Sequence, residues 1–350
     1  MLGPSYIADF SSRGPTQDGR SVPHVVAPGK YMLSAASRPD IVGECDATGN
    51  VPSPGEGSGG LVSMAGTSMS APVVSGMAAL IRQYFEEGYY PAGRKGEGTA
   101  FGPSAAVVKA VIINGAQVNM NGVDNIGRVT GVAPYDNTMG FGRVDLLTSL
   151  YLDGWSYVQV KVWDESLQIG IQEEKAYVIK IDKSGGCAFP DLSVTLVWVE
   201  RASVVGCARC VLNDLDLTVT RSGDGTVYHP NGLTSPDRIN NAERVVVTGA
   251  SDGEEFVATV RAHNLDDDVQ KFALVSTGCF GGTISALSDS VDVFDDDDPP
   301  MSRTRIFLIV VCSVVAVIIV AILGTYCFQM AKDRKANQGG GGGGGTVLTE

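Results

Sequence analysis

The sequence has little charge, few histidines and more acid than base. Charged residues make up 19% of its 350 residues, whereas hydrophobic residues make up 44%. This composition supplies a sizeable core and excludes a chain that is disordered throughout. The formal net charge of −13 repels phosphate backbones, so we expect no nucleic-acid partner. A chain of this length predicts two globular units with appendages.

The N-terminus also lacks the features of a secretory leader, because Met1–Ser5 has neither a positive start nor an apolar segment. The other end is different: Ile306–Phe328 is a run of 23 residues without a charge. A bilayer core about 30 Å thick needs ~20 such residues in a helix, so the run predicts a transmembrane helix, with a buried core helix as the alternative. We therefore expect a single-pass membrane protein of type I, with its folded part lumenal or extracellular.

Composition also divides the C-terminal part of the chain. The acidic run Asp295–Asp298 and two prolines predict a solvated stalk over residues 284–304. The transmembrane helix then covers residues 305–328. Seven glycines, Gly339–Gly345, predict a disordered tail over residues 329–350.

Five cysteines precede the apolar run, an odd number whose pairing the sequence does not reveal: Cys45, Cys187, Cys207, Cys210 and Cys279. Cys207-Ala208-Arg209-Cys210 has the spacing of a redox or zinc motif. No second pair of ligands accompanies it, so a structural disulfide is the preferred interpretation.

After Trp155 the sequence changes to short segments in which apolar and polar residues alternate, separated by turn signals such as Ser222–Gly225. Eight such segments predict an all-β jelly-roll sandwich over residues 153–283. The candidate strands are Tyr157–Val162, Ala176–Ile181, Leu192–Val199, Leu215–Thr220, Thr226–His229, Arg244–Thr248, Glu255–Ala262 and Phe272–Thr277.

The stretch Gly66–Pro72 reads Gly-Thr-Ser-Met-Ser-Ala-Pro, and an apolar run rich in small residues follows it to Ile81. Such a run predicts a buried helix with Pro72 in its first turn. Ser68 then lies at the helix N-terminus, where free N–H groups stabilise developing negative charge. A serine at this position is also a common N-cap, so these residues alone leave both roles open.

Five ordered segments resemble those of the subtilase family of serine proteases, and Gly66–Pro72 resembles its nucleophile motif. The other four are Phe10–Thr16, Val25–Gly29, Pro103–Ala110 and Gly140–Asp145. The resemblance implies an α/β fold for residues 1–152, the C-terminal half of a subtilisin-like catalytic domain with part of its parallel sheet. It also implies that Ser68 is the nucleophile that becomes acylated, with its own N–H as one oxyanion donor.

In subtilases the aspartate, the histidine base and the oxyanion asparagine precede the segment that Phe10–Thr16 resembles. Only nine residues precede Phe10, and none of His24, His229 and His263 stands in the family's histidine context. We therefore expect an N-terminally truncated chain whose first 150 residues neither fold stably nor cleave peptides when expressed alone.

The segments Asn213–Val219, Asn240–Val246 and Gln270–Val275 resemble the β-jelly-roll domain that follows the catalytic domain in one branch of subtilases. Asp214 and Asp216 share one face of a predicted strand and are candidate ligands of a structural Ca²⁺ ion. Surface solvation is the favoured alternative, because the remaining ligands are not identified. The chemistry itself requires no cofactor.

The sequence thus predicts a membrane-anchored, subtilisin-like serine endopeptidase that acts on proteins or peptides through a Ser68 acyl-enzyme. The alternative is a non-catalytic, membrane-displayed binding module derived from a subtilase. A third hypothesis is that another chain supplies the missing half.

Overall fold

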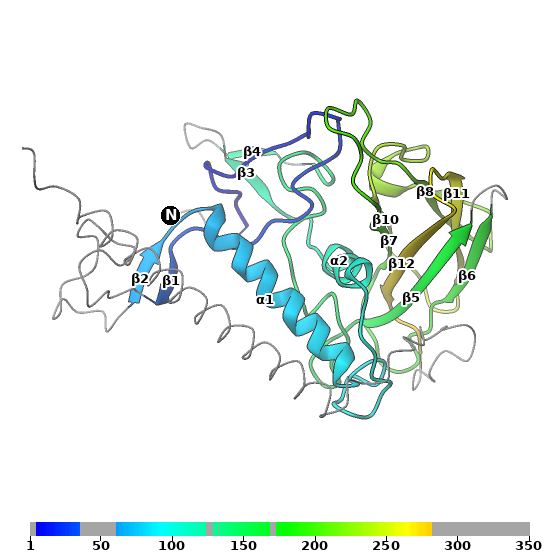
Figure 1. Ribbon diagram of the computed structural model, residues 1–350. Coiled ribbons are helices and arrows are strands. Elements are labelled where there is room, and N and C mark those ends of the chain that lie inside the picture. The colour runs from blue at the N-terminus through cyan, green and yellow to red at the C-terminus, as the bar shows by residue number, and fades with distance from the viewer. Residues whose placement is uncertain (1–4, 36–60, 124–128, 132, 169–172, 282–350) are drawn as a thin grey trace, which may run out of the picture. The chain divides into compact units, whose positions relative to one another are not determined.

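The computed structural model describes residues 5–35, 61–123, 129–131, 133–168 and 173–281 (Figure 1). All of these belong to one of the two compact units of the chain, Met1–Val291. The predicted stalk and glycine-rich tail lie outside the described residues.

The first part of the chain holds two helices and two small antiparallel sheets. Strands β1 (Met32–Ala35) and β2 (Leu61–Met64) pair with each other, as do β3 (Asn121–Val123) and β4 (Val129–Gly131). The helices are α1 (Thr67–Glu86) and α2 (Ala105–Asn114).

The rest of the described chain forms two four-stranded antiparallel sheets, in the strand orders β10-β7-β12-β5 and β6-β11-β8-β9 (Figure 1). A short 3₁₀ helix, Pro230–Gly232, follows β9. Each of the eight predicted strands overlaps one of the observed strands. These are β5 (Gln159–Gln168), β6 (Glu174–Lys180), β7 (Leu192–Trp198), β8 (Asp214–Arg221), β9 (Val227–Tyr228), β10 (Ala242–Val247), β11 (Glu255–Asn264) and β12 (Val269–Gly278).

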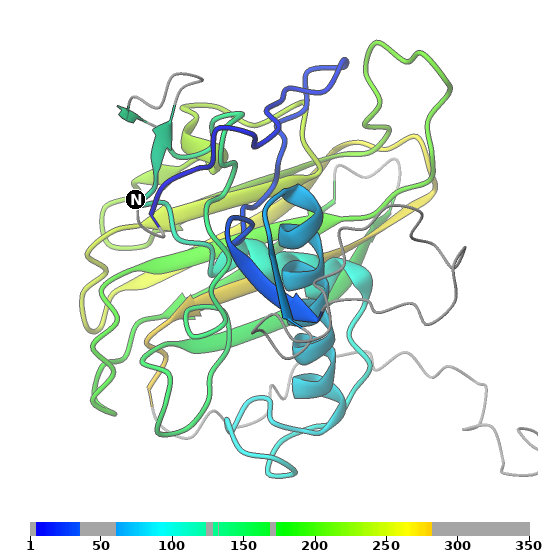
Figure 2. The ribbon, with the colours of Figure 1, turned by 90° about the vertical axis from the view of Figure 1, so that its left-hand side faces the viewer.

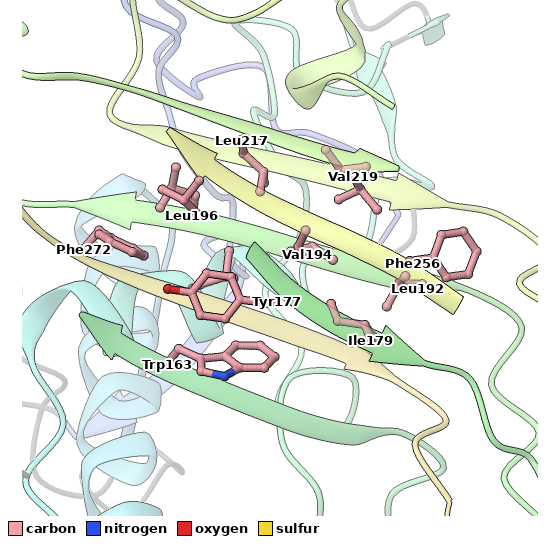
Figure 3. Close-up of a cluster of buried hydrophobic side chains, with 14 of the residues drawn as sticks. Trp163, Tyr177, Ile179, Leu192, Val194, Leu196, Leu217, Val219, Phe256 and Phe272 are labelled. Carbon is pink, nitrogen blue, oxygen red and sulfur yellow. The ribbon is translucent and has the colours of Figure 1, made fainter. Parts of the chain in front are cut away.

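The main core lies between the two sheets, and alternate residues of β6, β7, β8 and β11 point into it (Figure 3). Leu192, Val194, Leu196 and Trp198 of β7 all belong to this core. Every residue of β7 is nevertheless buried. The outer face of the sheet that contains β7 must therefore be covered as well. In an ordinary sandwich the outer face of each sheet is solvated.

Helix α2 covers that second face. It contacts β7 and β12 of the sheet on one side and α1 on the other, so α2 lies between α1 and the sandwich. Its apolar side chains share a second core with Val160, Val162, Ala273 and Val275 of the sheet. Because this core draws on both parts of the chain, the helices and the sandwich stabilise each other. We therefore expect the described part to fold within the 350-residue chain, in contrast to the expectation from the sequence that its first 150 residues do not.

Two buried polar residues lie within the contact between α2 and the sheet. Asn114 donates to Thr277 Oγ1 at 2.8 Å and accepts from Ser193 Oγ at 2.9 Å and Thr195 Oγ1 at 2.8 Å. The guanidinium of Arg244 donates to three carbonyl oxygens of the first part of the chain and to one hydroxyl of the sandwich. Its acceptors are the oxygens of Ile113 at 3.2 Å, Ala116 at 2.9 Å and Phe141 at 3.2 Å, and Ser193 Oγ at 3.2 Å.

Helix α1 is only partly buried, which corrects the prediction of a buried helix. Its buried residues are Ile81, Tyr84 and Phe85, close to its C-terminal end. There Phe85 packs on Tyr90 and Phe101 of the following loop. Ser75, Gly76, Ala79 and Leu80 are exposed. In Figure 2 the sandwich lies behind α1, on the far side of the helix from the viewer.

The predicted fold class requires correction. The strands within residues 5–152 form two antiparallel pairs, and parallel contacts among the described residues are limited to single bridges such as Val26↔Arg143. Each bridge is an isolated pair of residues and is not part of a longer strand pairing. The described residues therefore contain no parallel sheet. The described structure is mostly antiparallel β-sheet with two α-helices.

The predicted transmembrane helix is not supported. No helix in the described part of the chain is long and apolar enough to cross a bilayer, and residues 305–328 lie outside that part. The predicted span rested on composition alone, and no helix among the described residues supports it. The single-pass membrane localisation inferred from it is likewise withdrawn.

Two disulfides join four of the five cysteines whose pairing the sequence left open. Cys187 pairs with Cys279 across 92 residues, and Cys207 pairs with Cys210. The structural interpretation of Cys207 and Cys210 agrees with this bond. Cys45 lies outside the described residues.

Substitution of Asn114 by alanine tests the contact between α2 and the sheet. Asn114→Ala leaves the hydroxyls of Thr277, Ser193 and Thr195 without this partner in a buried site, so we expect the free energy of unfolding to fall by about 3 kcal/mol. Chemical denaturation followed by tryptophan fluorescence measures the change. The control Asn264→Ala, at an exposed strand end, should shift the value by less than ~0.5 kcal/mol. A loss below ~1 kcal/mol in Asn114→Ala would contradict the role assigned to this residue.

Candidate active site

The candidate site begins at the N-terminus of α1, where Gly66 precedes the helix with φ 156° and ψ 164°. This backbone conformation favours glycine, because a Cβ atom makes it strained. The N–H of Gly66 donates to the oxygen of Gly29 at 2.7 Å, and its own oxygen accepts from the N–H of Met69 at 3.0 Å. The glycine thereby turns the chain sharply into the first helical turn.

Gly29 ends a second motif segment, Val25–Gly29, and lies against this turn. A Cβ atom at Gly29 would overlap Ser70 Oγ and lie 2.8 Å from the oxygen of Gly66. Only glycine permits such a close approach of the two backbones. The structure therefore brings Val25–Gly29 and Gly66–Pro72 together, although they are far apart in the sequence.

The segment Gly140–Asp145 lies on the other side of Val26. Val26 donates its N–H to the oxygen of Gly142 at 2.9 Å and accepts from Val144 N at 3.0 Å. Gly140 has φ 57°, and a Cβ atom there would overlap the oxygen of Pro23. The Phe10–Thr16 segment joins the same group, since Gly14 N donates to the oxygen of Asn137 at 3.0 Å.

Ser68 itself is exposed in the first turn of α1. No acidic residue stands in that turn, so no carboxylate offsets the partial positive charge of the helix N-terminus. Pro72 was predicted in the first turn of the helix, but it lies in the second turn because α1 already begins at Thr67. Among the described residues, the Ser68 hydroxyl has no hydrogen-bond partner. The site therefore has an accessible hydroxyl beside free backbone donors, but the described residues supply no base for it.

The three histidines lie in other surroundings. The ring of His24 stacks on Phe141, with the ring centroids 6.4 Å apart. His229 precedes the 3₁₀ helix, and His263 is exposed on β11 of the sandwich. No hydrogen bond joins any of them to Ser68 in the described part of the chain.

His24 and Lys109 are two basic groups in a largely desolvated position. Burial first, and then the charges of Lys109 and Arg20, lower the pKa of His24 to about 4. Burial also lowers the pKa of Lys109 to about 8. Neutral His24 is therefore the form that the folded chain prefers.

The candidate Ca²⁺ ligands on β8 are paired with arginines. Arg238 Nη1 contacts Asp214 Oδ1 at 3.3 Å and also contacts Asp216, while Arg209 Nη2 lies 2.6 Å from Asp214 Oδ2. These contacts compensate both carboxylates without a metal, and both are almost fully buried and not solvated at the surface. Calcium binding by the chain stays a prediction.

Sequence reasoning did not identify Asn114, which holds the C-terminal end of α2 against the sandwich, or Arg244, which also binds the Gly140–Asp145 segment through the oxygen of Phe141. Arg244 lies in the run Ala-Glu-Arg-Val-Val-Val of β10. A charged pair within an otherwise apolar strand is the signal that could have identified Arg244, since charge is buried only where it has partners.

The pKa of His24 predicts a pH-dependent stability. The unfolded chain binds a proton near pH 6.5, whereas folded His24 does so only near pH 4. Stability is therefore lost as the pH falls from about 6.5 to about 4, by up to about 3 kcal/mol. Denaturation across this range should show a shallower pH dependence in His24→Gln than in the unsubstituted chain. His263→Gln is the matched control and should change nothing. Equal pH slopes for His24→Gln and the unsubstituted chain would refute the assignment.

Comparisons with known proteins agree with the motifs brought together around Ser68. Residues 3–142 match the sequence model of the Subtilase family. The serine protease/ABC transporter B family proteins tagD and tagB of Dictyostelium discoideum are 30% and 28% identical to the chain, over 78% of its residues in each case.

The matched region spans only 17% of tagD and 16% of tagB. The serine protease AprX of Bacillus subtilis (strain 168) is 38% identical over 77 residues, which cover 22% of this chain and 16% of AprX. Through residues 3–142, the chain belongs to the subtilase family.

Proposed function

We propose that the chain is the nucleophile-bearing part of a serine endopeptidase and that its substrates are proteins or peptides. The observation that carries this proposal is the exposed Ser68 hydroxyl at the uncompensated N-terminus of α1. Three glycines support that geometry: neighbouring atoms leave no room for a side chain at Gly29 and Gly140, and the positive φ of Gly66 disfavours one there.

In the proposed reaction, Ser68 Oγ attacks the scissile carbonyl carbon while a base takes its proton. Negative charge then develops on the carbonyl oxygen, where the Ser68 N–H and the helix dipole stabilise it. The C–N bond breaks, the amine leaves with the proton, and the acyl group stays on Ser68. Water later hydrolyses this ester and regenerates the hydroxyl.

A base is essential because a serine hydroxyl is a weak nucleophile by itself. We infer that the base, its carboxylate and a second oxyanion donor come from a segment that precedes Met1 in a longer gene product. The relatives, which extend far beyond the matched region, support this inference.

The exposed side of α1 is the surface that such a segment would cover. Its small residues Ser75, Gly76 and Ala79 allow a close approach of another element. Leu80 on α1 is 52% exposed, and Leu33 on β1 and Met64 on β2 are also exposed. Covering these side chains would remove apolar surface from water and so favour binding of the segment.

Covalent labelling tests the proposed nucleophile. In the longer product that includes the preceding segment, we expect a fluorophosphonate probe to modify Ser68, as peptide mass mapping would show. Ser68→Ala should abolish labelling and lower peptide turnover by about 10⁶-fold, the scale of nucleophile loss in subtilisin. Ser75→Ala on the same helix is the matched control and should keep both.

Absence of the label from Ser68 in a folded longer product would overturn the endopeptidase proposal. It would favour a non-catalytic binding module instead. Labelling that needs a second polypeptide would show that another chain supplies the base.

A charge on the exposed face of α1 tests the covering segment. In the longer product, Leu80→Asp buries a carboxylate against that segment, so we expect labelling of Ser68 to fall at least tenfold. Val178→Asp, at a residue 59% exposed on β6, is the control and should leave labelling unchanged. The stability of the 350-residue chain itself should change little with either substitution. Full labelling of Leu80→Asp would show that this face stays uncovered.

A further inference from the structure

The loop between β7 and β8 carries a disulfide whose two cysteines, Cys207 and Cys210, are each partly exposed. Cys207 and Cys210, only three positions apart, close a small ring within this loop. The loop projects from the sandwich, with Val204 76% exposed and Val205 fully exposed at its tip. Both sulfurs therefore lie in a segment that a thiol reagent can reach.

The other disulfide differs in loop length and in the burial of one of its sulfurs, since Cys187 is partly exposed whereas Cys279 is buried. Cys187 and Cys279 are 92 residues apart, and Cys279 is 1% exposed within the sandwich core. Closing a long loop removes far more entropy from the unfolded chain than closing a ring of four residues. Exposed disulfides are also those that exchange readily with thiols. Access and loop length therefore both make Cys207–Cys210 the more reducible bond.

The residues around Cys207–Cys210 connect it to the subtilase segment. The N–H of Cys210 donates to Asp18 Oδ2 at 3.3 Å. Asp18 also accepts from Thr16 at 2.6 Å and from Arg20 at 2.8 Å. The ring thus fixes one backbone donor against the loop formed by residues 16–20.

A second contact runs through Arg209, which lies between the two cysteines. Its guanidinium pairs with the buried carboxylate of Asp214 at 2.6 Å. The closed ring thus keeps Arg209 in contact with Asp214 of the sandwich and keeps the N–H of Cys210 in contact with Asp18. Opening the ring would free the backbone that positions both contacts.

We propose that Cys207–Cys210 is a site of thiol–disulfide exchange whose reaction partner is a dithiol reductant. One thiolate of the reductant attacks a sulfur of the pair, and the S–S bond breaks to give a mixed disulfide and a free cysteine thiolate. The second thiolate of the reductant then displaces the other cysteine. Two electrons and two protons pass to the pair, which becomes two thiols, and the reductant becomes a disulfide. Reduction releases Asp18 of the 16–20 loop from the β7–β8 loop, while the N–H of Ser21 stays bound to Asn240 Oδ1 at 2.7 Å.

Graded reduction of the folded 350-residue chain tests the site. The chain is equilibrated in mixtures of reduced and oxidised dithiothreitol, alkylated with iodoacetamide and mapped by mass spectrometry. Cys207 and Cys210 should become alkylated at a reductant concentration at least ~10-fold below that which opens Cys187–Cys279. Opening of both pairs together, or of Cys187–Cys279 first, would overturn the proposal.

Hydrogen exchange tests the consequence for the 16–20 loop. The double variant Cys207→Ser/Cys210→Ser represents the reduced state and should show faster amide exchange in residues 14–21 while the sandwich strands stay protected. The pair Cys187→Ser/Cys279→Ser serves as the comparison and should instead weaken protection near β12. Unchanged exchange in residues 14–21 would refute the release of the loop.

Discussion

The structure depends on a buried cation and a buried amide between α2 and the sandwich. Arg244 and Asn114 lie where polar groups are costly unless every donor and acceptor finds a partner. Arg244 satisfies carbonyl oxygens at and beyond the C-terminal end of α2, the end that attracts positive charge. The apolar contacts of the second core could tolerate small displacements of the helix, whereas these hydrogen bonds fix its position. These hydrogen bonds therefore select one specific position of α2 on the sheet among those that apolar packing alone would allow.

From that contact, a continuous series of backbone hydrogen bonds leads to the candidate nucleophile. Arg244 binds the oxygen of Phe141, whose segment pairs with Val26. The segment of Val26 ends at Gly29, which accepts the N–H of Gly66, the residue before α1. These contacts connect the sandwich to the start of α1, where Ser68 lies. In this interpretation the β-domain contributes to the proposed chemistry by holding the loops that shape the helix N-terminus, because small displacements of a reacting group strongly slow a reaction.

Local sequence patterns predicted the strands well and the burial poorly. Alternation along the strands and turn signals located all eight strands of the sandwich, because each pattern reflects one strand's own two faces. The same reasoning predicted a buried α1, since an apolar run cannot reveal whether a neighbour is present to cover it. It also missed Arg244 and Asn114, whose side-chain hydrogen-bond partners lie between 51 and 163 residues away in the sequence. The parallel sheet and the membrane helix were inferred from resemblance and composition, and the described structure bears out neither.

The most direct test of this account measures how the Arg244 contact affects the segments beside Ser68. Arg244→Lys keeps a positive charge but cannot donate to the same set of acceptors. Hydrogen exchange of the variant should quicken in residues 140–145 and 25–29 and at the start of α1, while β8 and β11 stay protected. Arg209→Lys, on the exposed β7–β8 loop, should leave those segments unchanged. Identical exchange in Arg244→Lys and the unsubstituted chain would show that the sandwich does not position the nucleophile segment.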